Sequence, residues 1–141
     1  MVTVLEQAEQ KALVTRCKME GIEVIGIENS LQFPIKAVLD IVKPFLNERE
    51  LATVKSRLST LMATLSNKRI SLGQRVGCPD LFIPKYHTFI ELKKRDGGKP
   101  SKEQLEMQAI LRSYGYTSEI IHGAKSSWEL IERQREKYEN G

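Results

Sequence analysis

Asp80, Glu91 and Lys93 are the residues whose types and spacing suit reaction chemistry. Asp80 follows a proline, and Glu91 and Lys93 occupy alternate positions in the apolar segment from 88 to 93. If that segment is a β-strand, alternation places the acid and the amine on one face and the intervening apolar residues on the other. Two carboxylates beside an ammonium group suit metal-assisted hydrolysis of a phosphodiester.

The loop between the two motifs fixes how close the acids lie. If residues 84 to 87 form a four-residue hairpin loop, Ile83 pairs with Thr88 and Asp80 lies opposite Glu91, with Cβ atoms about 5 Å apart. Two carboxylates at that distance can hold a divalent cation, whereas without one they repel each other. The two acids therefore favour a metal site. For Lys93 the alternative to a catalytic role is a surface salt bridge to Glu91.

Length and composition indicate one soluble globular domain over residues 1–141. Hydrophobic residues make up 40% of the 141 residues, which is enough for a single packed core. No apolar run reaches about 18 residues, so no membrane span is predicted. The first residues lack the basic and apolar regions of a secretory signal, so we expect an intracellular, cytoplasmic location. Cys17 and Cys78 lie far apart without a CxxC pattern and are interpreted as buried structural thiols.

Positive charge is concentrated on both sides of the Asp80 motif. No acidic residue occurs between Leu51 and Pro79, and a second basic cluster begins at Lys93 and runs to Lys102. Beside paired carboxylates, this pattern predicts that a polyanion such as DNA lies across the site. Solvated lysine-rich surfaces are the alternative interpretation.

Periodicity and capping signals predict an α/β fold, a mixed β-sheet flanked by helices. The predicted elements are a helix over 3–20, a strand over 22–29, helices over 34–68 broken around 44–47, a hairpin over 81–94, a helix from 101 to about 114, a strand over 117–122 and a helix capped by Ser126 that runs to about 138. The hairpin supplies the antiparallel strands of the sheet.

The helical stretch before the hairpin carries a long apolar stripe. The stripe comprises Leu51, Val54, Leu58, Leu61, Met62 and Leu65. A stripe of this length must be buried, either in the core or in a dimer face.

The helix after the hairpin has a clear start signal. Ser101 and Gln104 fit a capping box. Its predicted buried face comprises Met107, Ile110, Leu111 and Tyr114. His87 and His122 are interpreted as loop or strand-end residues, because neither stands in a metal or nuclease spacing, and Trp128 as a core residue.

In its motifs the chain resembles the PD-(D/E)XK nuclease superfamily and, within it, the virus-type replication-repair nuclease (VRR-NUC) domain. Pro79-Asp80 supplies the PD and Glu91-Leu92-Lys93 the ExK. Further matching residues are Gly77, Leu81, Ile90, Ser101, Gln104, Leu111, Gly115 and Tyr116, with Glu6 and Gln10 extending the match to the first helix. The chain departs from the minimal domain by the helical insert at about 34–72.

The resemblance implies a restriction-endonuclease-like fold and assigns roles to the site residues. Asp80 and Glu91, with the Leu92 carbonyl, would coordinate Mg²⁺ or Mn²⁺, hard cations that prefer oxygen ligands. Lys93 would orient the attacking water or help remove its proton, and would offset charge on the phosphate. Gln104, besides its capping role, would steady Lys93 or a phosphate.

Glu6 has two interpretations. With Thr3 it fits a capping box, which explains it without catalysis. One helical face also contains Glu6, Gln10, Leu13 and Cys17. If that face meets the sheet, Glu6 points towards the metal as a further ligand, direct or through water. Glu9, on a neighbouring face, is the substitute candidate.

The sequence therefore predicts a metal-dependent DNA endonuclease. The resemblance implies a preference for branched DNA, with Holliday-junction resolution as the specific expectation, and a phage as a suitable source. Symmetric cutting of a four-way junction needs two active sites and hence a homodimer. The alternatives are a flap or restriction-type nuclease, and a DNA-structure binding protein without turnover.

Overall fold

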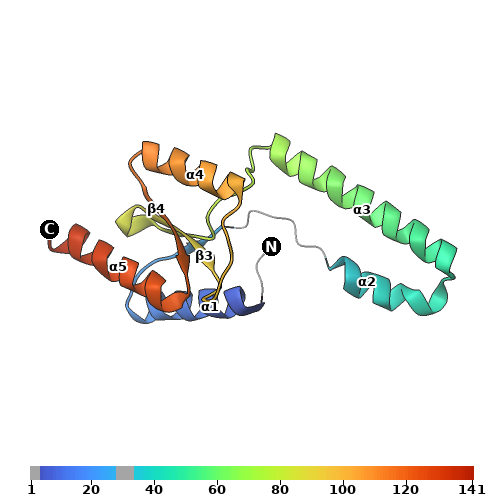
Figure 1. Ribbon diagram of the computed structural model, residues 1–141, viewed down its shortest axis with the longest axis horizontal. Helices are drawn as coiled ribbons and strands as arrows, with labels where there is room; N and C mark the ends of the chain where they lie inside the picture. Colours follow the sequence, from blue (N-terminus) through green and yellow to red (C-terminus); the bar gives the residue numbers. More distant parts are fainter. Residues whose placement is uncertain (1–3, 28–33) are drawn as a thin grey trace. The chain divides into compact units, whose positions relative to one another are not determined.

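The computed structural model describes residues 4–27 and 34–141, and its chain divides into two compact units (Figure 1). The first, which we call the sheet unit, comprises Met1–Asn29 and Val76–Gly141, and the second, the helical unit, comprises Ser30–Arg75. The predicted single nuclease domain stays a prediction. No helix within the described ranges is both long and apolar enough to cross a membrane.

The sheet unit is an α/β structure with a mixed four-stranded sheet. Its strands are β1 (Ile25–Gly26), β2 (Leu81–Ile83), β3 (Thr88–Lys93) and β4 (Thr117–His122), in the spatial order β1-β2-β3-β4. β1 pairs with β2 and β2 with β3 in antiparallel fashion, whereas β3 and β4 are parallel. The parallel pair requires a crossover, and α4 (Lys102–Ser113) supplies it.

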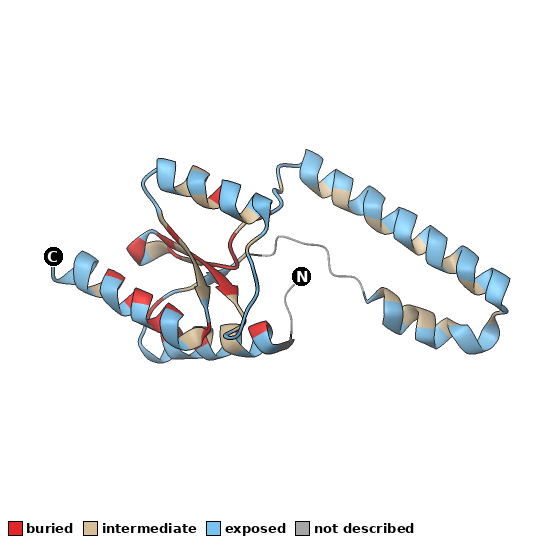
Figure 2. Ribbon diagram, in the orientation of Figure 1, coloured by how far each residue is buried: buried red, intermediate tan, exposed pale blue. Residues whose placement is uncertain are grey.

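Helices cover both faces of this sheet. Figure 1 shows α4 on one face, and α1 (Val4–Met19) with α5 (Ala124–Glu139) on the other. The main apolar core lies between the sheet and the α1–α5 pair, and it comprises Leu13, Cys17, Ile22, Leu81, Ile83, Tyr86, Ile90, Trp128, Leu130 and Ile131. In Figure 2 the buried residues gather on the strands and on the helix faces turned towards them.

The hairpin that joins β2 to β3 has the predicted register. Ile83 pairs with Thr88, and the intervening residues form a short 3₁₀ helix, η2 (Pro84–Tyr86), followed by His87 at φ 47°. His87 is therefore a loop residue and His122 a strand-end residue, as predicted. This register determines which side chains reach the candidate site.

The helical unit contains the two predicted helices with a break at the predicted place. α2 (Ile35–Val42) runs into a 3₁₀ turn, η1 (Lys43–Phe45), and α3 (Glu48–Ser71) follows. Asn47 caps α3 by accepting from the Glu50 amide, while the Glu50 carboxylate accepts from the Asn47 amide. None of the residues in α2, η1 or α3 is buried.

Several sequence predictions are corrected by the structure. The first strand is only two residues long within the part of the chain described, and Thr3, Glu28 and Asn29 lie outside the described residues. Of the predicted buried face of α4, only Met107 is buried, Ile110 and Leu111 are partly buried, and Tyr114, which follows the helix, is 78% exposed. Cys78 is only partly buried.

The predicted start of the last helix was also wrong. α5 begins at Ala124 after Gly123, ahead of Ser126. The Ala124 amide donates to the Glu9 carboxylate of α1 at 2.6 Å, so a side chain remote in sequence caps this helix in place of the local serine.

Candidate active site

Asp80 and Glu91 are brought together by the β2–β3 hairpin. Asp80 immediately precedes β2, and its Oδ2 accepts a hydrogen bond from the Leu92 amide at 3.0 Å. Both acids are buried, with 7% of Asp80 and 6% of Glu91 exposed. The predicted juxtaposition is therefore present. The hairpin register places the two acids side by side, although two carboxylates repel each other.

Lys93 lies on the same face as Glu91. Its Nζ is 3.5 Å from Glu91 Oε1, and both side chains are largely shielded from solvent. This is the geometry that strand alternation predicts for residues two apart. The pair is thus a shielded ion pair beside Asp80, and not a solvated surface salt bridge.

Gln104 connects the first turn of α4 to Glu91. Its Nε2 donates to Glu91 Oε1 at 2.6 Å, while its Oε1 accepts from the Ser101 amide at 2.9 Å. The Ser101 hydroxyl completes the capping box by accepting from the Gln104 amide. Gln104 therefore forms the predicted capping box, but its side chain contacts Glu91 rather than Lys93. The cap determines which amide atom faces Glu91.

The second oxygen of Glu91 is in a different position. Glu91 Oε2 is buried and has no hydrogen-bond partner, although buried polar atoms normally find one. Burial, followed by the nearby charge of Asp80, raises the pKa of Glu91 to about 7. A buried acceptor without a donor is where a cation or a proton would be stabilising.

The pKa of Asp80 is also raised, mainly by burial. The Leu92 amide and the Lys93 ammonium act in the opposite direction, and the charge of Glu6 raises it further. Glu6 likewise contributes to the raised pKa of Glu91. The pKa values of Asp80 and Glu91 are thus both raised by burial and by neighbouring negative charge, which is the electrostatic pattern of a site that binds positive charge.

Glu6 and Glu9 differ clearly in their surroundings. Glu6 is buried on the α1 face that also buries Leu13 and Cys17, and its charge acts on both site acids. Glu9 is instead engaged with Arg95, at 3.2 Å, and with the Ala124 amide. The structure therefore brings Glu6 to the site and holds Glu9 in a contact between α1 and the start of α5.

Gly77 has a role that the motif alone did not reveal. Its φ is +88°, and a Cβ placed on it would lie 2.5 Å from the carbonyl atoms of Glu103 and 2.8 Å from the Gln104 amide nitrogen. The loop before Asp80 thus packs directly on the backbone of the α4 first turn. Only glycine combines this conformation with this approach.

The turn after β3 covers the Lys93 side chain. A Cβ on Gly98 would lie 3.6 Å from the Cβ of Lys93, and the Gly98 carbonyl is 2.9 Å from His122 Nε2. His122 therefore anchors the turn that packs on Lys93. Sequence reasoning missed this contact because nothing local to His122 indicates that a turn more than twenty residues earlier lies beside it.

The site offers some of the oxygen ligands that a hard divalent cation needs. Asp80 and Glu91 offer carboxylate oxygens, and the Leu92 carbonyl points to the same side of β3 as the amide that binds Asp80, since both groups of a strand residue project together. Within residues 4–27 and 34–141, no group of three or more His, Cys, Asp or Glu is placed to hold a metal ion. Two carboxylates, a carbonyl and waters are a donor set that Mg²⁺ accepts.

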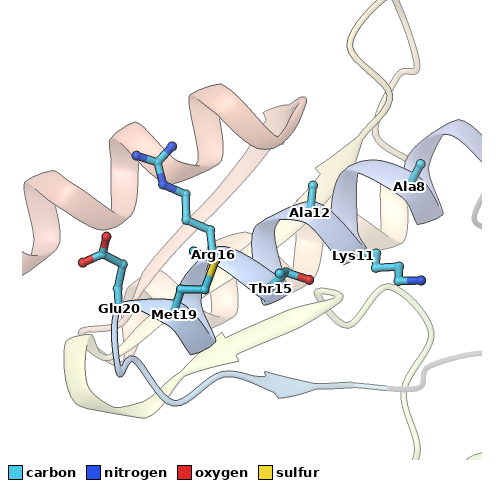
Figure 3. Close-up of a pocket in the computed structure, with 7 residues that line it drawn as sticks. All are labelled: Ala8, Lys11, Ala12, Thr15, Arg16, Met19 and Glu20. Atoms are coloured by element: carbon cyan, nitrogen blue, oxygen red, sulfur yellow. The ribbon is translucent and has the colours of Figure 1, made fainter.

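A hollow elsewhere on the sheet unit is separate from the candidate site. It has a volume of about 610 Å³ and lies along the exposed side of α1, lined by Ala8, Lys11, Ala12, Thr15, Arg16, Met19 and Glu20 (Figure 3). Its lining residues belong to α1 and to Glu20, which directly follows that helix, and none is among the residues of the candidate site.

Comparisons with models of known protein families, with curated proteins and with solved structures found no match. The geometry of the site must therefore support any assignment of function.

Proposed function

We propose that this protein is a Mg²⁺- or Mn²⁺-dependent deoxyribonuclease with a PD-(D/E)XK fold of the VRR-NUC type. The observation that carries the proposal is the buried Asp80–Glu91 pair, with Lys93 Nζ 3.5 Å from one Glu91 oxygen and the other oxygen without a partner. A DNA-binding surface gains nothing from burying acids together, because acids repel phosphates. A hydrolytic site does gain from it.

Each residue has a role that follows from its position. Asp80, Glu91 and the Leu92 carbonyl would hold the cation, with Glu6 as a further ligand, direct or through water. When bound, the cation would polarise the phosphate and lower the pKa of a water molecule. Gln104 holds Glu91 Oε1, which leaves Oε2 to face the cation site.

Lys93 is the group that would meet the substrate. Its ammonium can donate to the attacking water or to a non-bridging phosphate oxygen, and it offsets the negative charge that builds up during attack. In hydrolysis, the water oxygen bonds to phosphorus as one ester P–O bond breaks. The products are a terminal phosphate and a hydroxyl group.

The segment between β3 and α4 supports DNA as the substrate. It carries Lys94, Arg95 and Lys99 and leads directly from Lys93 to α4, which begins at Lys102 and bears Gln104. Positive groups beside a phosphate-cutting site neutralise the DNA backbone without reading its sequence. Branched DNA is the proposed substrate class, and a four-way junction its specific form.

The test is cleavage of labelled four-way junction, flap, single-stranded and duplex DNA with Mg²⁺, Mn²⁺ or EDTA. We expect metal-dependent cutting with the junction preferred. In the Asp80→Asn variant the rate should fall by more than about 100-fold, because losing a ligand costs more than losing its supporting contacts, while DNA binding is retained. The control is Glu129→Gln, which removes an exposed acid of α5.

The outcomes separate the alternatives. Preferred cutting of flaps or of plain duplex would indicate a flap or restriction-type nuclease. Binding of junctions without cutting by either protein, with any metal, would contradict the nuclease assignment and indicate a DNA-structure binding protein.

A further inference from the structure

Three aromatic rings lie together on the face of the sheet that carries Glu91 and Lys93. Phe82 pairs with Phe89 across β2 and β3, and strand alternation places Phe89 on the same face as Glu91. The two rings are stacked, with centroids 4.4 Å apart and planes 19° apart. Tyr116, which directly precedes β4, stands edge-on to both, at 5.3 Å from Phe89 and 6.3 Å from Phe82. We call Phe82, Phe89 and Tyr116 the aromatic platform.

The platform lies outside the main apolar core. Leu81 and Ile90, the strand neighbours of the two phenylalanines, belong to that core, whereas none of the platform residues does. Phe82 and Phe89 are partly buried, and Tyr116 is 36% exposed. The rings therefore face away from the α1–α5 pair and keep surface that solvent can reach.

α4 covers only part of this face of the sheet. The Gln108 and Arg112 side chains donate to the Ser118 carbonyl of β4 at 3.1 and 3.0 Å, which holds the helix over that edge strand. Towards the opposite edge, Ile25 of β1 pairs with Phe82 and is 47% exposed. Apolar surface is thus exposed next to the platform, on the side away from α4.

The hairpin register also places the platform beside the candidate site. The Asp80–Glu91 pair and the Phe82–Phe89 pair are two residues apart on each strand, which is about 7 Å. The ring pair is therefore the next pair on the same face after the two acids. A phosphate at the cation site would have the base of an adjacent nucleotide within reach of the rings.

The chemistry of the platform suits a nucleobase. Aromatic side chains bind bases by stacking, and every base has a flat face that can stack. In a paired duplex these faces are already stacked on one another, so only an unpaired or displaced base can use the rings. The segment after Lys93 adds Lys94, Arg95 and Lys99, which suit the phosphates of the same strand. A protein partner on the rings would instead obstruct the neighbouring site.

We propose that the aromatic platform stacks with an unpaired base of the DNA strand that is cut, next to the cleaved phosphate. The inference rests on the proposed function, which supplies both the DNA and the position of the phosphate. It narrows the substrate class to branched DNA with a base released from the duplex at the branch point. No particular base is required, because stacking does not read hydrogen-bonding groups.

The first test compares two DNA probes in EDTA, where binding is measured without cleavage. One is a four-way junction with two unpaired thymines at the branch point, and the other has abasic sites at the same two positions. Both probes carry the same phosphates, so only the bases differ. The wild type should bind the thymine probe at least about tenfold more tightly, measured by fluorescence anisotropy. Equal affinities would overturn the proposal.

Leucine substitutions test which rings are responsible. Phe82→Leu/Tyr116→Leu keeps apolar side chains but removes two aromatic faces, so its affinities for the two probes should agree within about twofold. Tyr116→Leu alone, at the most exposed platform position, should reduce the preference at least about threefold. This single variant decides the question if the double variant does not fold.

The matched control is Tyr114→Leu. Tyr114 is 78% exposed and, within the part of the chain that the structure describes, has no ring contact with either phenylalanine. Its variant should keep the full preference for the thymine probe. An unchanged preference in the Tyr116 variants, or an equal loss in Tyr114→Leu, would contradict the proposal.

A purely structural role of the rings would give a different result. If Tyr116→Leu lowers the free energy of unfolding in urea but leaves the probe preference unchanged, the rings only stabilise the fold and the proposal is wrong. With 2-aminopurine in place of one unpaired thymine, stacking should quench the fluorescence on binding to the wild type and much less on binding to Tyr116→Leu.

The two proposals fail separately. Metal-dependent cutting together with equal binding of both probes would contradict the stacking alone. Base-dependent binding that Tyr116→Leu reduces, without cutting with any metal, would support the stacking and contradict the nuclease.

Discussion

The two oxygens of the Glu91 carboxylate have different surroundings, and this difference organises the candidate site. Oε1 meets both the Lys93 ammonium and the Gln104 amide, while Oε2 is buried without a partner. A carboxylate held by one oxygen keeps a fixed orientation. The other oxygen is without a partner, so under the proposed function one oxygen would set the orientation of the side chain and the other would bind the cation.

The two acids on α1 should respond differently to substitution. Glu6→Gln removes a buried charge that acts on Asp80 and Glu91, and we expect the cleavage rate to fall at least about tenfold. Glu9→Gln should leave the rate within about twofold, because Glu9 contacts Arg95 and the Ala124 amide instead. Single-turnover cleavage rates measure both.

Glu9→Gln should nevertheless change the stability of the protein, and this change serves as the control for the substitution. Weakening the cap on α5 should lower the free energy of unfolding by about 1 kcal/mol, measured by urea denaturation. If Glu9→Gln reduces cleavage as strongly as Glu6→Gln while the fold is intact, the assignment of these two acids is wrong.

Gly77 should tolerate substitution much less than a glycine of similar backbone conformation. Gly77 and Gly115 have φ angles of +88° and +89°, but only at Gly77 would a Cβ meet backbone atoms. Gly77→Ala should cost about 3 kcal/mol or more, from the conformation and the clash together, whereas Gly115→Ala should cost only about 1–2 kcal/mol. Equal losses in urea denaturation would contradict the close packing of this loop on α4.

At the scale of elements, the first turn of α4 links helix capping to the site. The Ser101 cap fixes the Gln104 amide, and Gln104 fixes Glu91. α3 has the same kind of capping box, formed by Asn47 and Glu50, in the helical unit. Of these two similar caps, only the one on α4 contacts Glu91.

These two caps provide a matched pair of variants. Ser101→Ala and Asn47→Ala should each lower stability by about 1 kcal/mol. Only Ser101→Ala should also reduce the cleavage rate, by about tenfold, because it loosens a contact that supports a ligand. Thermal unfolding and single-turnover rates measured on both proteins test this, and a rate loss in both would show that stability alone is responsible.

At the scale of the whole molecule, the raised pKa values couple stability to pH and to metal. Glu91 has a pKa of about 7 in the folded protein, above its value of about 4.3 in an unfolded chain. The folded protein therefore binds this proton more tightly than the unfolded chain does. The resulting stabilisation of the fold is fully present below about pH 4 and is lost as the pH rises through about 7. The raised pKa of Asp80 acts in the same direction.

This coupling gives a prediction for the metal-free protein. In EDTA, the melting temperature of the wild type should fall between pH 5 and pH 8 relative to that of Glu91→Gln. Mg²⁺ or Mn²⁺ should raise the wild-type melting temperature more at pH 8 than at pH 6, since protons compete with the cation for the carboxylates. Differential scanning calorimetry measures both, and identical pH profiles for the two proteins would contradict it.

The sequence by itself determined the features that depend on local periodicity. Strand alternation placed Glu91 beside Lys93, and the loop length set the hairpin register that brings Asp80 to Glu91. The break around 44–47 located the start of α3, and the Ser101 capping box located that of α4. These relations span few residues, so backbone geometry alone fixes them. The coarse α/β architecture followed from the same signals, while the nuclease family stays a prediction.

Only the tertiary structure decided the contacts that cross between elements. It showed that Gln104 binds Glu91, that Glu9 rather than Ser126 caps α5, that Gly77 packs on α4, and that the apolar residues of α3 are not buried. Each of these depends on how separate elements pack against one another. Local sequence patterns do not give the distance between separate elements. For this reason the sequence left Glu6 and Glu9 as alternatives.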